Sequence, residues 1–124
     1  MSNSVFFNRP SRATLILGGL FGALGVITAA AASHSGDEHL LGAASTICLA
    51  HGPVLVALGL FGLRTRVLSG AAILLGLGTL IFAGDLMARH FLGSSLFPMA
   101  APLGGLGMIG GWLALVVAGF AARG

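Results

Sequence analysis

Long apolar stretches, separated by short polar segments, occupy almost the whole chain. They cover residues 13–32, 40–63, 67–87 and 101–122. About 20 residues at a rise of about 1.5 Å cross a hydrocarbon core roughly 30 Å thick, so each stretch is long enough to span a bilayer. The pattern predicts one all-α integral membrane domain over residues 1–124, in which four antiparallel spans form an up-down four-helix bundle.

Two prolines interrupt the chain before the last span. Pro98 and Pro102 lie four residues apart, and Pro102 suits the first turn of a helix, where its missing amide donor costs nothing. We therefore expect the fourth helix to begin near Ala101. Residues 91–100 are expected to lie at the membrane interface. In this register Trp112 falls in the middle of its span, where we expect it to pack against glycines of another helix.

Composition excludes a water-soluble fold and gives no sign of an enzyme. Of the 124 residues, 56% are hydrophobic and only 7% are charged, too few to cover the surface of a soluble domain. Cys48 is the single cysteine, so the chain forms no internal disulfide. The sequence contains no phosphate loop, nucleophile triad or redox dithiol. We therefore expect membrane lipids as its surroundings and name no catalytic residues.

The basic residues indicate how the spans are oriented. All six are arginines, and five fall on one side of the predicted spans: Arg9, Arg12, Arg64, Arg66 and Arg123. Cytoplasmic segments of membrane proteins collect arginine, so both termini and the connection between spans two and three are expected inside. Residues 34–39 and 89–96 are then outside. Arginines beside a span indicate topology here, and we expect no nucleic-acid partner.

Glycine is unusually frequent inside the spans, with 21 residues in the chain. Small residues one turn apart allow two helix backbones to approach closely in lipid. The candidates for such packing are Gly18, Gly22, Gly104, Gly105, Gly107 and Gly111. Packing within the four-helix bundle and packing between two copies of the chain both fit this pattern.

His51 is the ionisable residue expected deepest in the membrane. Such residues are costly in lipid and are the best pointers to function. It is a neutral imidazole bonded to a neighbouring helix, or else a proton relay, a cofactor ligand or a lipid-quinone contact. His51 lies about 12 residues, or roughly 18 Å, from the outer end of its helix and has no equally deep histidine partner, which argues against haem held by this chain alone.

Asp85 and Arg89 are four residues apart, a spacing at which side chains meet on one helix face, so we expect an intrahelical ion pair. They lie near an outer rim that gathers further polar residues: His34, Asp37, Glu38, His39 and His90. This spacing matches no specific metal motif, and we expect no bound metal and no cofactor. His34, His51, Asp85 and Arg89 remain the candidate functional polar residues.

Several motifs resemble the YgdD-like family of small bacterial inner-membrane proteins, known as domain of unknown function 423. They are the first span closing on Ala32-Ser33-His34, His51 of span two, residues 82–86, and Pro102-Leu103-Gly104-Gly105 followed by Gly111-Trp112. The resemblance implies four spans in the bacterial inner (cytoplasmic) membrane and brings no established activity. The chain departs from the family pattern at Asp85, where we expect serine, and at Gly52-Pro53.

These observations predict a structural or accessory protein that packs in the membrane, against a larger membrane complex or as a homo-oligomer. One alternative is a small transporter or proton-conducting protein that uses His51 and Asp85. Its polar lining beyond these two would be Ser45, Thr46 and Thr79. The other alternative is a cofactor-binding redox subunit that takes ligands from a partner.

Overall fold

The computed structural model describes residues 10–122 and shows an all-helical chain over that range. The helices are α1 (Arg12–Ser35), α2 (Ala43–Phe61), α3 (Arg66–Leu92) and α4 (Ala100–Ala121), and a short π-helical turn, η2 (Glu38–Gly42), leads directly into α2. Four helical segments are long and apolar enough to cross a membrane, with η2 and α2 counting as one. This confirms the prediction of an all-α chain with four helices that are able to span a membrane.

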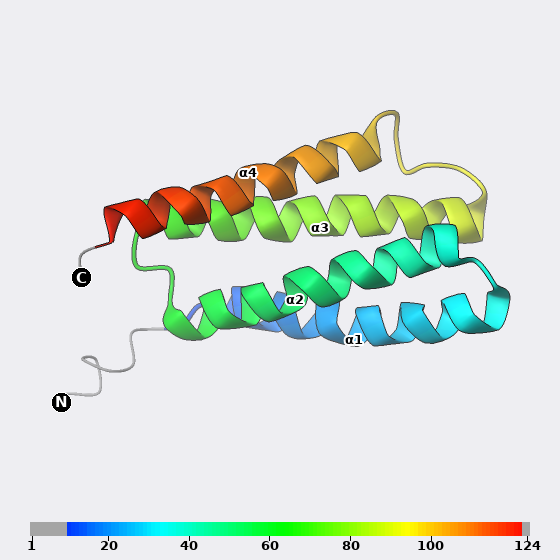
Figure 1. The fold of residues 1–124 in the computed structure, drawn as a ribbon, viewed down its shortest axis with the longest axis horizontal. Coiled ribbons are helices and arrows are strands. Elements are labelled where there is room, and N and C mark those ends of the chain that lie inside the picture. The colour runs from blue at the N-terminus through cyan, green and yellow to red at the C-terminus, as the bar shows by residue number, and fades with distance from the viewer. Residues whose placement is uncertain (1–9, 123–124) are drawn as a thin grey trace.

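Successive helices run in opposite directions, so the connections gather at two ends (Figure 1). The start of α1, the connection 62–65 and the end of α4 lie at one end, which we call the arginine end because it carries Arg12, Arg64 and Arg66. The α1–α2 turn and the connection 93–99 lie at the opposite, carboxylate end, which carries all three acidic residues. Arg9 and Arg123, which we predicted on the arginine side, lie outside the described residues.

Helix ends differ from the predicted spans mainly at the carboxylate end. Helix α1 continues to Ser35 and α3 to Leu92, and each stops at a glycine with positive φ, 76° at Gly36 and 78° at Gly93. Glycine adopts this left-handed conformation without the steric cost of a Cβ. Of the segment predicted at the interface, residues 91–92 are therefore helical and residues 93–99 form the connection to α4.

Helices α1 and α2 form a closely packed hairpin because glycines face each other. A Cβ built on Gly18 would lie 2.8 Å from the carbonyl oxygen of Gly52, and one built on Gly52 would lie 2.9 Å from that of Gly18. These distances are shorter than real Cβ contacts, so the two backbones touch. Gly22 contributes its backbone to this contact, although a Cβ on Gly22 itself would meet nothing within 4 Å.

Helices α3 and α4 form a second hairpin in the same way. A Cβ on Gly78 would lie 2.7 Å from the carbonyl oxygen of Gly104, and a Cβ on Gly111 would lie 2.6 Å from Leu75. Gly107 makes ordinary contact with Gly78 at 3.5 Å, and Gly105 faces only the ring of Phe82 at 4.0 Å. Close backbone approach replaces the hydrophobic drive that is absent between helices in lipid.

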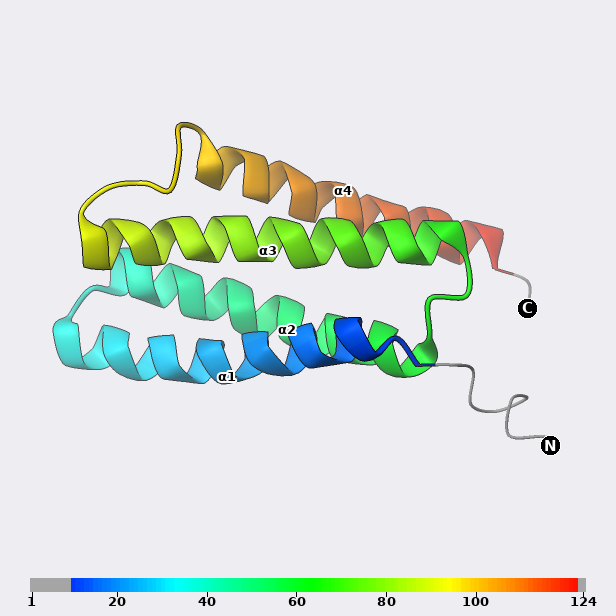
Figure 2. The same ribbon diagram turned by 180° about the vertical axis from the view of Figure 1, so that it is seen from behind.

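The two hairpins meet along α2 and α3, where Cys48, Leu55, Ala72 and Leu75 form part of the buried core. No Cα atom of α4 lies within 8 Å of one in α1 or α2. The helices thus follow one another across the molecule in the order α1, α2, α3, α4 (Figures 1 and 2). This arrangement is more open than the predicted four-helix bundle, because the backbone of α4 packs closely only against α3.

Candidate functional site

His51 and Trp112 meet deep inside the membrane-spanning part of the molecule. The indole Nε1–H of Trp112, on α4, donates a hydrogen bond of 3.1 Å to Nε2 of His51, on α2. Nδ1 of His51 lies 2.9 Å from the carbonyl oxygen of Ile47, one turn earlier on α2. An indole N–H only donates and a carbonyl only accepts, so the imidazole is neutral with its proton on Nδ1.

The surroundings of this pair leave His51 little freedom. His51 is only 5% exposed, and the two rings meet edge to face with centroids 5.6 Å apart. Gly52 holds this turn of α2 against α1, while Gly111 holds the neighbouring turn of α4 against α3. The structure thus places His51 as a neutral imidazole bonded to a neighbouring helix, one of the interpretations that the sequence left open.

Sequence reasoning missed this partnership, although a signal was present. Trp112 is 12 residues from the start of α4 and His51 is 13 residues from Glu38, so each lies well inside its own span. An indole N–H in the middle of a bilayer needs an acceptor. The single tryptophan and the single mid-span histidine were therefore candidate partners, although the sequence does not specify how their helices are placed.

This geometry occupies both ring nitrogens of His51. Metal or haem ligation through Nε2 requires that the bond to Trp112 first break, and so does proton uptake at that atom. The proposed polar lining does not extend the site either: Ser45 donates to the carbonyl of Gly25 at 2.7 Å and Thr46 to that of Gly42 at 3.0 Å. The Thr79 hydroxyl is buried without a hydrogen-bond partner among residues 10–122.

Asp85 is fully buried near the carboxylate end of α3. Its Oδ2 accepts a bond of 2.9 Å from Nε of Arg89, so the expected ion pair is present. Its Oδ1 accepts a bond of 2.9 Å from the backbone N–H of Leu96. The same carboxylate thus binds its own helix and the connection 93–99, a second role that the i, i+4 spacing did not predict.

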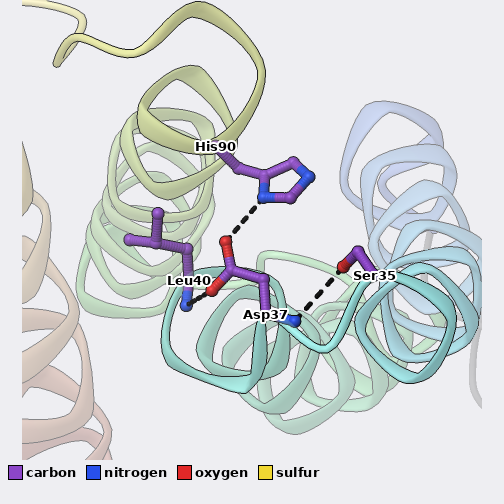
Figure 3. A network of polar contacts seen from close by, with 4 residues as sticks. All are labelled: Ser35, Asp37, Leu40 and His90. Carbon is purple, nitrogen blue, oxygen red and sulfur yellow. Dashed lines mark hydrogen bonds and ion pairs between the residues drawn. The ribbon is translucent and has the colours of Figure 1, made fainter.

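Asp37 joins the α1–α2 turn to α3 (Figure 3). Its Oδ1 accepts from the N–H of Leu40 at 3.0 Å, and its Oδ2 lies 2.6 Å from Nδ1 of His90. Its own N–H donates to the Ser35 hydroxyl at 3.2 Å. The N–H of Leu40, and after it the His90 ring, hold the pKa of the Asp37 carboxyl below its usual value, against the opposing effect of desolvation.

The other rim residues do not converge on one point. His34, Glu38 and His39 are exposed. No group of three histidine, cysteine or acidic side chains in the described part of the chain is placed to hold a metal ion. The four candidates therefore lie at three separate places. Asp85 is a buried carboxylate paired with the half-exposed Arg89, His51 bonds to another helix inside the membrane-spanning part, and His34 is at the surface.

Comparison with protein families matches residues 19–105 to the family described as "Protein of unknown function (DUF423)". The chain belongs to this family. The match covers most of its length, from within α1 to the second turn of α4, and includes His51 and Asp85 but stops before Trp112. Neither curated proteins nor solved structures gave a match.

Proposed function

We propose that this DUF423 protein is a structural or accessory component of the bacterial inner (cytoplasmic) membrane, and that it performs no transport or catalysis of its own. The observation that supports this proposal is the bonding of His51. Its two ring nitrogens are engaged by Trp112 and Ile47, so the imidazole serves to connect α2 to α4. A proton relay needs a ring nitrogen free to take up a proton and a polar neighbour to pass it on.

The proposed orientation places the arginine end in the cytoplasm, with both termini on that side. Arg12, Arg64 and Arg66 mark this end, and Arg89 at the other end is paired with Asp85. Arginines near the ends of spans set orientation in this way. Reporter domains fused at the two termini should both report the cytoplasm, and a reporter inserted in the connection 93–99 should report the opposite side. Termini on different sides would contradict the proposal.

The surface proposed for a partner is the outer face of α4. Only 17% of the most apolar 18-residue stretch of α4 is buried within the chain, the smallest share among the four spans. Large apolar side chains cover this face: Leu106, Ile109, Leu113, Val117 and Phe120. Lipid covers such a face in a lone protein, and a helix of a larger complex or of a second copy covers it in an assembly.

The test is purification in a mild detergent with a matched pair of variants. Leu113 on α4 and Leu20 on α1 are 59% and 60% exposed. A partner or second copy at fixed stoichiometry should be lost in Leu113→Trp and kept in Leu20→Trp. A lone monomer that conducts protons in vesicles, with the flux abolished by His51→Ala, would instead establish transport. A Soret band or bound metal in the purified protein would establish the redox alternative.

A further inference from the structure

A groove between α1 and α3 opens on the outside of the molecule at the arginine end. It has a volume of about 310 Å³, near the lower limit of ligand pockets, roughly 300–1000 Å³. Leu17 of α1 and Ile73 of α3 form its walls, and the fully buried Leu55 of α2 forms its floor. The groove exists because α1 and α3 both pack against α2 and scarcely touch each other; Figure 2 shows α2 behind the space between them.

Measured from the start of α3, the groove reaches to about the depth of one leaflet of a bilayer. On α3 its lining reaches Leu77, which is 11 residues, or about 16 Å, from the first residue of the helix, Arg66. Half of a hydrocarbon core of roughly 30 Å is about 15 Å. The inner end is closed where Leu17 of α1 meets Gly76 of α3, since a Cβ on Gly76 would lie 2.9 Å from the Leu17 side chain.

The mouth of the groove carries positive charge and no negative charge. Arg66 lies seven residues before Ile73 and 11 before Leu77, so it shares their face of α3. Arg12 directly precedes Ala13, which lines the groove on α1. Both helices begin at this end without an acidic residue in their first turns, so their N-terminal dipoles add to the positive potential. All three acidic side chains lie at the opposite end.

We propose that this groove binds an anionic phospholipid from the leaflet at the arginine end. One acyl chain lies in the apolar groove between α1 and α3, and the phosphate headgroup meets Arg66 and Arg12. The Arg64 guanidinium sits 4.1 Å from the centroid of the Phe61 ring and borders a different pocket, so it takes no part. Arginines that only set the orientation of a membrane protein need lie no more than near a span, whereas this site also requires the apolar groove beneath Arg66 and Arg12.

Native mass spectrometry of the full chain in mild detergent tests the headgroup. The probes are dioleoyl phosphatidylglycerol and dioleoyl phosphatidylcholine, which share their acyl chains and differ in headgroup charge. The wild type should bind the anionic lipid at least tenfold more tightly. Arg66→Gln should weaken that binding about fivefold and the double variant with Arg12→Gln roughly 25-fold, since each basic side chain contributes about that factor near an anionic headgroup. Arg66→Lys should retain most of it.

Arg64→Gln is the matched charge control, because it removes the same charge from the same rim. It should weaken phosphatidylglycerol binding less than twofold. A loss equal to that of Arg66→Gln would show that any charge at this end suffices, and equal affinity for the two lipids would show no headgroup selection. Either result overturns the proposal.

A second pair of variants tests the acyl-chain site. Ala13 lines the groove and Ala57 does not, and both are exposed alanines in the arginine half of the molecule. Ala13→Phe should weaken binding of both lipids at least fivefold, while Ala57→Phe should leave it unchanged. Unchanged binding in Ala13→Phe overturns the proposal, as does a wild-type dimer that Ala13→Phe dissociates, because the groove would then hold a second copy. The arginine variants decide the question alone if Ala13→Phe fails to fold.

Discussion

Trp112 and His51 are joined by a hydrogen bond of 3.1 Å that connects α4 to α2, although no Cα atoms of these helices approach within 8 Å. Because α3 lies between α2 and α4, only long side chains can connect these two helices, and the Trp112 and His51 side chains do so. A second polar link, Asp37 to His90, joins the hairpins at the carboxylate end. The apolar contact of α2 with α3 is thus supplemented by directional bonds at two depths, which fix how one hairpin sits against the other.

Removing the indole donor should destabilise the protein by about 1–2 kcal/mol, because Trp112→Phe leaves the buried Nε2 of His51 without a partner. In a double-mutant cycle with His51→Leu, the coupling between the two residues should be about 0.6–1.7 kcal/mol, the range for hydrogen bonds between helices in lipid. Unfolding in mixed micelles with increasing denaturing detergent measures each free energy. Additive single effects would show that the bond contributes nothing.

Gly18→Ala and Gly104→Ala should each destabilise the fold by about 1–3 kcal/mol. The new Cβ would lie 2.7 Å from a backbone nitrogen of the facing helix, Val56 for Gly18 and Phe82 for Gly104, and a backbone cannot move aside as a flexible side chain does. Gly22→Ala is the matched control on α1, because its Cβ would meet nothing within 4 Å.

The same unfolding assay distinguishes these variants. Gly22→Ala should be neutral or slightly stabilising, since alanine is the better helix former. If Gly22→Ala were as harmful as Gly18→Ala, the glycines would act through some property other than close approach, and the hairpin geometry described above would be wrong.

Local patterns in the sequence predicted the parts of this structure that depend on local physics. Span lengths gave the four helices, and the spacing of Asp85 and Arg89 gave their ion pair, because both follow from the geometry of one helix. Glycine spacing identified stripes of small residues, but it does not tell which way each glycine faces. The Cα of Gly22 therefore borders the contact with α2 while its missing side chain would point away.

Contacts that depend on the path of the chain between helices were not predictable in this way. The bond from Leu96 to Asp85 exists because the connection 93–99 turns back over α3, with Gly93 and Met99 at positive φ. Met99 carries no sequence signal for that conformation. The His51–Trp112 bond depends on how α4 is placed across α3 from α2, and spacing along the chain does not specify that placement.

Acid should weaken the carboxylate end through Asp37. The folded-state pKa of this carboxyl is lowered, so its contribution to stability is present above the unfolded value of about 3.9 and is lost as the pH falls through the lower folded value. Asp37→Asn keeps an acceptor for the N–H of Leu40 and removes the ion pair with His90. The variant should be less stable than the wild type at pH 6, and this difference should shrink towards pH 3. A difference independent of pH would exclude a role for the charge.

The Asp85 carboxylate should control the connection 93–99. In Asp85→Leu the Leu96 N–H loses its buried acceptor, at a cost of about 1–3 kcal/mol, while Arg89, which is 47% exposed, turns to solvent at little cost. Amide exchange at Leu96 should then accelerate by about tenfold or more, since 1.4 kcal/mol corresponds to a factor of ten. Arg89→Gln is the control that removes the ion pair and keeps the acceptor, so Leu96 should stay protected. Equal protection in wild type and Asp85→Leu would mean that the connection holds its shape without this bond.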